Sequence, residues 1–247
     1  MLPTDDRYDP LPSQGERHSF KVSDLYAFAP SIFVFVVAFV ADSTVTPFQR
    51  DVSEYVDGPA ISHPRLPQTV TAMQLYLYAF ILPSILIILL CALRRDWELL
   101  RTSLQGLFEA IAITWLITTT TKKMAGSLRP NFYSLCGWNG TACTGPDIAV
   151  TSAHQSFPSG HASGAGVGLT YLSLFLCHLS KNLTSKSSFH EVIAVSFRYV
   201  ALLPIIFAVW ISITRTIDYY HRFEDITAGL VLGVGAAFAC SSGRLHP

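Results

Sequence analysis

Residues 75–93 read LYLYAFILPSILIILLCAL and contain no charged side chain. A helix that crosses a bilayer needs about 20 mostly apolar residues, and this run is apolar on all sides of a helix instead of along one stripe. A buried helix of a large soluble core is the alternative interpretation. The whole chain argues against it, because only 14% of its 247 residues are charged, against about 25% in a typical soluble domain. We therefore expect an all-α integral membrane protein.

Six segments of this apolar kind predict six transmembrane helices. They cover residues 25–41, 72–93, 104–121, 160–179, 199–213 and 226–240. The spans form one expected domain over residues 22–243. Residues 1–21 are polar and lack the apolar core of a signal peptide, so we expect a disordered cytosolic tail there, with a short second tail at residues 244–247. The net charge of zero gives no basic field that would attract nucleic acid.

Lysine and arginine are unequally shared between the two sides that six spans define. The side that holds both termini has ten: Arg7, Arg17, Lys21, Arg94, Arg95, Arg101, Lys181, Lys186, Arg198 and Arg244. The opposite side has seven: Arg50, Arg65, Lys122, Lys123, Arg129, Arg215 and Arg222. Cytosolic loops carry the excess of positive charge in membrane proteins. The side with both termini is therefore predicted to be cytosolic, and the opposite side exoplasmic.

Three polar motifs stand at the ends of these spans, all on the predicted exoplasmic side. They comprise Lys122 with Arg129-Pro130, then Pro158-Ser159-Gly160-His161, and then Thr214-Arg215 with His221 and Asp225. Taken singly, each has a structural interpretation, since interfacial cations snorkel and a Ser-Gly pair often caps a helix. Three such motifs on one membrane face are better explained by a shared site.

The cationic residues and the Ser-Gly pair of these motifs suit the binding of a phosphate. The transition state of phosphoryl transfer spreads negative charge over three equatorial oxygens, and fixed cations such as Lys122, Arg129 and Arg215 stabilise it. Ser159 and Gly160 open an apolar helix, where free backbone N–H groups and the helix dipole favour an anion.

The two histidines supply the remaining chemistry. One can attack phosphorus while the other protonates the leaving oxygen, and histidine serves either role near neutral pH. Asp225 lies four residues after His221, so we expect both on one helical face, with the carboxylate orienting the imidazole. His161 has no acidic neighbour in sequence, which suits a proton donor.

The loop between the first two motifs carries two signs of an oxidising compartment. Asn139 begins an N-glycosylation sequon, and Cys136 and Cys143 flank it closely enough for a disulfide. A second sequon at Asn182 lies in a predicted cytosolic loop and should be unused.

Two further features have structural interpretations. Glu109 lies inside the third span, and we expect it to reach water or Arg101 at the cytosolic end. The pairs Gly160 with Gly164 and Gly229 with Gly233 place small residues on one helix face, which predicts close packing of the fourth span against the sixth. Dimerisation through these faces is the weaker alternative.

The motifs together resemble the type 2 phosphatidic acid phosphatase superfamily, which also includes the vanadium haloperoxidases. The family pattern is KxxxxxxRP, then PSGH, then SRxxxxxHxxxD, and this chain departs from it only at Thr214, where the family has Ser. The neighbouring Ser156-Phe157 and Asp218-Tyr219 also resemble the branch of membrane lipid phosphate phosphatases. The resemblance covers residues 25–243 and implies a haloperoxidase-like helical core.

The resemblance also implies roles for the motif residues. His221 would form a phosphohistidine, Asp225 would orient it, and His161 would act as general acid and then base. The implied phosphate ligands are Lys122, Arg129, Ser159, Gly160 and Arg215. No metal or cofactor is implied.

Implied substrates are phosphatidic acid, lysophosphatidic acid, sphingosine 1-phosphate or ceramide 1-phosphate, taken from the bilayer at the plasma membrane, endoplasmic reticulum or Golgi. The alternatives are a phosphatase for polyprenyl or diacylglycerol diphosphates and a non-catalytic lipid-binding relative. A homo-oligomer is left open.

Overall fold

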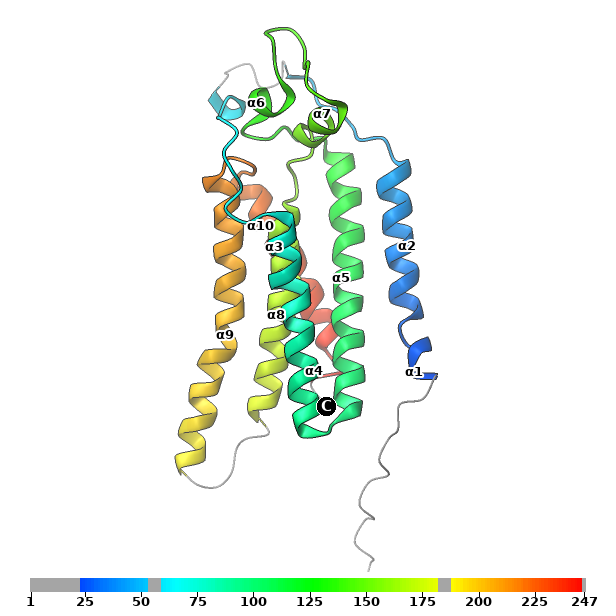
Figure 1. Cartoon of the computed structure of the whole chain (residues 1–247), viewed down its shortest axis with the longest axis vertical. Coiled ribbons are helices and arrows are strands. Elements are labelled where there is room, and N and C mark those ends of the chain that lie inside the picture. The colour runs from blue at the N-terminus through cyan, green and yellow to red at the C-terminus, as the bar shows by residue number, and fades with distance from the viewer. Residues whose placement is uncertain (1–22, 53–58, 182–187, 246–247) are drawn as a thin grey trace, which may run out of the picture.

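The computed structural model describes residues 23–52, 59–181 and 188–245, which form an elongated helical bundle (Figure 1). The predicted tail at residues 1–21 lies outside these ranges. Within them, apart from isolated bridge positions at Trp138, Cys143 and Ser242, the regular structure is helical. The main helices are α1 (Ser23–Tyr26), α2 (Ala29–Thr44), α3 (Ala72–Tyr76), the π-helical turn η3 (Leu77–Ile81), α4 (Leu82–Arg94), α5 (Trp97–Ala125), α6 (Phe132–Cys136), α7 (Asp147–Ala153), α8 (Gly160–Lys181), α9 (Ser188–Ile217) and α10 (Phe223–Ser241). The predicted all-α class is confirmed.

Local sequence signals set several helix ends. The hydroxyl of Thr71 accepts a hydrogen bond from the backbone N–H of Gln74, whose side chain returns to Thr71, and this capping box starts α3. The carboxylate of Asp96 caps α5 through the N–H of Leu99. At its other end α5 stops at the C-cap residue Gly126. Its φ of 55° lies in the left-handed region that often ends a helix.

Four helical segments are long and apolar enough to cross a membrane: Ala72–Arg94, Gly160–Lys181, Val195–Ile217 and Phe223–Ser241. The apolar helix α2 is shorter, at 16 residues, than the roughly 20 that a straight span needs. α5 has 29 residues and is not among the four. The number of six spans therefore stays a prediction.

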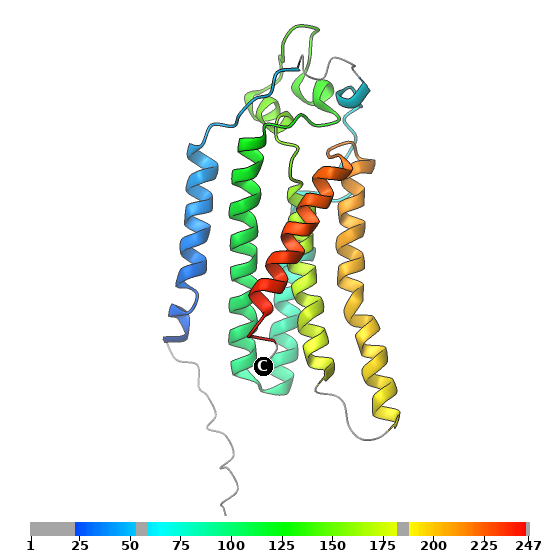
Figure 2. The ribbon, with the colours of Figure 1, turned by 180° about the vertical axis from the view of Figure 1, so that it is seen from behind.

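α8 lies at the centre of the bundle, where α10, α9, α5 and η3 surround it (Figures 1 and 2). Its glycines and those of its neighbours allow very close backbone approach. A Cβ on Gly168 would overlap the carbonyl oxygen of Ala79 in η3, and one on Gly233 would overlap the carbonyl of Ser163. α8 therefore serves as the scaffold for the residues at its first turn.

The predicted packing of glycine pairs is only partly right. Gly229 and Gly233 do face α8, as expected for contact between these two spans. Gly164, however, faces Leu75 and Phe80 of the second span, and nothing lies near the Cβ position of Gly160. Because α8 is surrounded, its small residues serve several neighbours instead of one.

Three side-chain contacts, spaced by seven or eight residues, hold α2 against α5. The Phe28 and Phe108 rings meet edge-on with centroids 5.9 Å apart, the Phe35 and Trp115 rings lie 5.5 Å apart, and Lys123 Nζ lies 3.5 Å from the Asp42 carboxylate. These contacts place α2 parallel to α5 along one side of the bundle.

Glu109 has a different partner from the one expected. Its carboxylate lies 2.6 Å from the guanidinium of Arg244, just beyond α10, whereas Arg101 pairs with Glu98 in its own helix. Arg101 and Glu98 share one helical turn, so their contact is local. The Glu109 partner comes from 135 residues away, which sequence spacing does not reveal.

Candidate active site

The predicted catalytic and phosphate-binding residues lie at the end of the bundle beneath α6 and α7, opposite the C-terminal end of the described chain (Figure 1). Each comes from a helix end or an adjoining loop: Lys122 in the last turn of α5, Arg129 after it, Ser159, Gly160 and His161 at the start of α8, Arg215 in the last turn of α9, His221 between α9 and α10, and Asp225 in the first turn of α10. Helix ends thus bring together residues that are far apart in sequence.

His221 and Asp225 meet, but not on a helical face as expected. His221 precedes α10, which begins at Phe223, while Asp225 caps that helix by accepting the N–H of Arg222 at 2.9 Å. The same oxygen of Asp225 lies 3.5 Å from Nδ1 of His221 and accepts the Ser156 hydroxyl at 2.6 Å. Both the imidazole and the carboxylate are almost fully buried. The carboxylate therefore fixes the imidazole through Nδ1 and leaves Nε2 facing the other way.

Arg129 lies on that other side of the ring, with Nη1 3.4 Å from Nε2 of His221. Its Nε donates to the carbonyl of Ser152 at 2.8 Å, and Nη1 reaches the carbonyl of Tyr220 at 3.3 Å. Burial, and then the charge of Arg215, lower the Arg129 pKa to about 10, which still leaves it charged at neutral pH. In these contacts Arg129 is held by neutral carbonyls, so its charge is available to an anion.

Arg215 is the largest fully buried side chain of the described chain. Its Nη1 donates to the carbonyl of Val70 at 3.2 Å and lies 3.4 Å from Asp218, and its guanidinium covers the Tyr220 ring at 4.7 Å. Asp218 in turn accepts the backbone N–H and the hydroxyl of Thr69 at 2.8 and 2.7 Å. The Nε of Arg215 has no hydrogen-bond partner among the described residues, so one donor of a fixed guanidinium is available.

Lys122 and His161 complete the cluster from the two central helices. Lys122 Nζ donates to the carbonyl of Gln155 at 3.1 Å. Burial, and then the charge of Arg129, lower the Lys122 pKa to about 7, and a bound phosphate would favour its charged form. Nε2 of His161 is buried and has no hydrogen-bond partner within the described ranges. A buried imidazole nitrogen without a partner is costly in a structural role and suits one that meets a ligand.

Asp225 also fixes the start of α8, through its backbone carbonyl. The N–H of Ser159 donates to the carbonyl of Asp225 at 3.0 Å, and the Ser159 hydroxyl accepts the N–H of Ala162 at 3.4 Å. Ser159 is fully buried. Its hydroxyl therefore caps α8. Gly160 is the first residue of that helix, and His161 follows it.

The electrostatics of the cluster favour an anion and a neutral nucleophile. Burial, followed by the charges of Arg129, Lys122 and Arg215, holds the pKa of His221 well below its usual value of 6.5. His221 is therefore neutral at physiological pH, and with Nδ1–H directed at Asp225 its Nε2 carries a lone pair. Three cations around a neutral imidazole are suited to binding a phosphate and attacking it.

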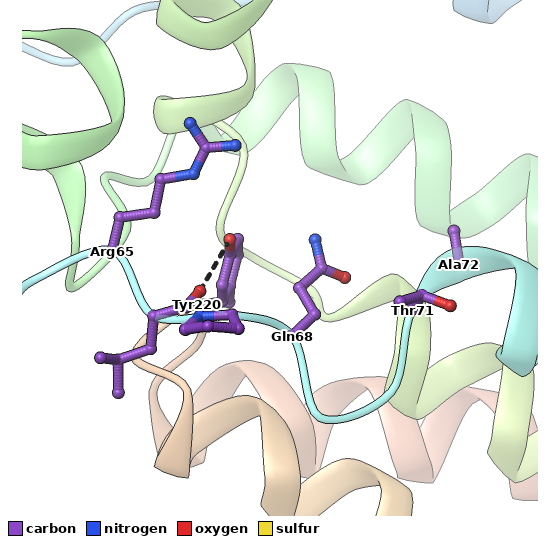
Figure 3. Close-up of a pocket in the computed structure, with 7 residues that line it drawn as sticks. Arg65, Gln68, Thr71, Ala72 and Tyr220 are labelled. Carbon is purple, nitrogen blue, oxygen red and sulfur yellow. Dashed lines mark hydrogen bonds between the residues drawn. The ribbon is translucent and has the colours of Figure 1, made fainter.

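Two cavities adjoin this cluster. One, of about 420 Å³, lies between residues 65–72 and Tyr220, whose hydroxyl donates to the carbonyl of Leu66 (Figure 3). Figure 3 shows Arg65 and Gln68 on either side of the Tyr220 ring. The other cavity, of about 520 Å³, which we call the lateral groove, runs between α2, α3–η3, α5 and α8 and ends at Lys122, Gly160 and His161.

Comparison with known families matches this arrangement. The family model described as the PAP2 superfamily covers residues 104–245, which include every motif residue. The chain belongs to the PAP2 superfamily. The apolar helices of this PAP2 chain and its similarity to lipid phosphate phosphatases identify a multi-pass membrane protein.

Several curated relatives are similar over most of the PAP2 chain. Lipid phosphate phosphatase 1 of Arabidopsis thaliana is 30% identical over 233 residues, which cover 90% of this chain and 69% of the relative. Diacylglycerol pyrophosphate phosphatase 1 of Saccharomyces cerevisiae is 33% identical over 204 residues, which cover 76% and 68%. No solved structure matches the chain.

The family departure at Thr214 has a simple structural outcome. Its side chain is buried, and the hydroxyl donates to the carbonyl of Ile211 in its own helix at 2.7 Å. A serine hydroxyl would make the same bond, so the change leaves the cluster as it is.

Two residues outside the assigned motif roles hold the site together. Ser156 holds Asp225, and Asp218 holds Arg215 to the segment before α3. The spacing of Arg215 and Asp218 by three residues is a usable signal, because opposite charges three apart meet on a helix. Nothing in the sequence connects Ser156 with Asp225, which follows 69 residues later.

The loop above the site has the features expected for it. A disulfide joins Cys136 and Cys143, whose Cα atoms lie 5.2 Å apart, and the isolated bridge closes the same short loop. Asn139 at its tip is exposed, as an acceptor of a glycan must be. The second sequon at Asn182 lies outside the described residues.

Proposed function

We propose that this PAP2 protein is a metal-independent lipid phosphate phosphatase that works through a phosphohistidine. The observation that carries the proposal is the lateral groove, whose apolar walls lead directly to Lys122 and His161. A cationic cluster alone suits any phosphate. One that ends an apolar groove between helices suits a phosphate attached to an apolar tail.

The geometry supports the following chemical steps. Nε2 of His221 attacks phosphorus and forms a P–N bond while the ester P–O bond breaks. His161 gives its proton to the leaving alkoxide. The positive charge that develops on His221 is balanced by Asp225 at Nδ1. In the second step His161 takes a proton from water, whose oxygen attacks phosphorus, and the P–N bond breaks to release inorganic phosphate and neutral His221.

The substrates that fit this proposal are lipid phosphomonoesters: phosphatidic acid, lysophosphatidic acid, sphingosine 1-phosphate and ceramide 1-phosphate. The names of the Arabidopsis relatives support this class. The charge asymmetry of the loops and the exposed Asn139 support an exoplasmic site. The plasma membrane and the endoplasmic reticulum or Golgi satisfy that requirement equally.

A lipid diphosphate is the second candidate substrate, and the pocket of Figure 3 favours it. The exposed Arg65 lies with Gln68 beside Tyr220, and the pocket shares Ala72 with the lateral groove. An additional phosphate at the mouth of the groove would find Arg65 as its cation. The relatives named diacylglycerol pyrophosphate phosphatase support the same class.

A substrate panel tests both candidates. Purified protein in EDTA should release phosphate from phosphatidic acid; no release from any lipid phosphate would leave a non-catalytic relative as the explanation, and a strict Mg²⁺ requirement would contradict the metal-independent steps. Arg65→Gln should lower kcat/KM for diacylglycerol diphosphate about tenfold, since a hydrogen bond to a charged group contributes about 1.5–3 kcal/mol, and leave phosphatidic acid unchanged. An equal effect on both lipids would remove the diphosphate role.

A further inference from the structure

The α5 wall of the lateral groove changes character along its length. Lys122 stands at the polar end, the hydroxyls of Thr118 and Thr119 follow, and Ile111 and Phe108 line the other end. These positions recur every three or four residues, so they share one face of the helix. Cation, hydroxyl and hydrocarbon follow one another in the same order as phosphate, polar backbone and acyl chain in a lipid.

The length of the groove matches one leaflet of a bilayer. From Lys122 to Phe108 is fourteen residues, or ~21 Å of helix at 1.5 Å per residue, and from Lys122 to Ile111 ~16 Å. Half of a hydrocarbon core of about 30 Å is ~15 Å. A chain that starts at the phosphate cluster therefore reaches the Ile111 level at about the depth where the leaflet ends.

Side chains close the groove at this depth. Phe108 meets Phe28 edge-on, and Phe28 is not among the lining residues. Ile111 and Phe80 line the groove and pack against the buried cluster that contains Leu107. Nearer to Lys122, Phe35 from α2 covers the groove beside Trp115. Phe108 and Tyr76 are 42% and 56% exposed, so the groove stays partly open toward the bilayer. Phe35 covers part of its outer side, and Ile111 with Phe108 forms the floor at its end.

We propose that the lateral groove binds one acyl chain and that its floor, formed by Phe108 and Ile111, sets the chain length that the enzyme accepts. This inference rests on the proposed lipid phosphatase function. A chain that ends above the floor fits without rearrangement. A longer chain has to displace the packed Phe28 and Phe108 rings or leave the groove toward the bilayer, and either loses contacts with the groove.

Lysophosphatidic acids of increasing chain length test the proposal, because they carry a single chain. In detergent micelles at a fixed surface fraction of substrate, kcat/KM of the wild type should stay level up to a limiting length and then fall about tenfold. Phe108→Ala should move that limit to longer chains, and Ile111→Trp to shorter ones. Ile117→Trp, on an exposed part of α5 outside the groove, is the matched control and should leave the limit where it is.

A water-soluble aryl phosphate, which has no chain, separates the groove from the chemistry. Both groove variants should hydrolyse it at the wild-type rate. The proposal is overturned if the wild type shows no limiting length, or if Phe108→Ala leaves the limit unmoved while aryl phosphate hydrolysis is intact. If the wild type hydrolyses the aryl phosphate but no lipid, the proposed function itself fails, which is a different result.

Discussion

Asp225 lies 3.5 Å from Nδ1 of His221, while Arg129 lies 3.4 Å from Nε2 on the opposite edge of the ring. The imidazole is thus held between an anion and a cation, with the anion at the nitrogen that carries the proton. This arrangement selects the tautomer whose Nε2 can attack a phosphate that Arg129 binds.

Asp225→Asn should lower kcat by about a thousandfold, because an amide keeps the shape but neither selects the tautomer nor balances charge on the ring. Binding of the lipid should change little, since the three cations remain. Steady-state kinetics on lysophosphatidic acid measure both quantities. A variant with near-normal kcat would show that the carboxylate only caps α10.

Ser156→Ala removes the 2.6 Å hydrogen bond to Asp225. We expect kcat to fall about tenfold and the free energy of unfolding to drop by about 1 kcal/mol, because the carboxylate is less firmly held. Ser134→Ala is the matched control, since its hydroxyl bonds the carbonyl of His63 away from the cluster. Equal kinetics for the two variants would contradict a positioning role for Ser156.

The low pKa of His221 predicts how stability depends on pH. Above pH 6.5 the imidazole is neutral in both folded and unfolded states, so it contributes no pH dependence. As pH falls below 6.5, the unfolded chain takes up a proton that the folded protein does not, and the free energy of unfolding falls by up to about 1.4 kcal/mol per pH unit. The difference in melting temperature between wild type and His221→Asn should therefore shift in this direction between pH 6.5 and 5. A constant difference would mean that folded His221 titrates normally.

Gly168→Ala tests the contact between α8 and η3. Its Cβ would overlap the carbonyl oxygen of Ala79, so the helices have to separate, and we expect a loss of about 2 kcal/mol in stability. At Gly235 nothing lies near the Cβ position, so Gly235→Ala should be neutral or slightly stabilising. Thermal melts in one detergent compare the two, and equal melting temperatures would place α8 and η3 further apart than described.

The exposed loop tip predicts a glycan in a eukaryotic host. Asn139 is exposed on the side that the charge count assigns to the exoplasmic face. Endoglycosidase should therefore increase gel mobility of the wild type but not of Asn139→Gln. A shift that persists in the variant would implicate Asn182 and reverse the assigned orientation.

The helices and the members of the site were predictable from sequence because their signals are local. Apolar runs mark helices, and polar motifs at their ends mark one membrane face. Contacts between residues distant in sequence were not predictable. Glu109 pairs with Arg244 and Ser156 with Asp225, and both contacts depend on how α10 packs. The pairing of His221 with Asp225 was predicted for the wrong reason. A four-residue spacing suggested a helical face, whereas the carboxylate reaches the imidazole from a helix cap.

Covalent trapping tests the central claim most directly. Wild-type protein mixed with lysophosphatidic acid labelled on phosphorus and quenched in alkali should carry label on His221, and this label should be lost on treatment with acid. His221→Asn should acquire none and release no phosphate. Label or turnover that persists in His221→Asn would contradict the phosphohistidine at this position.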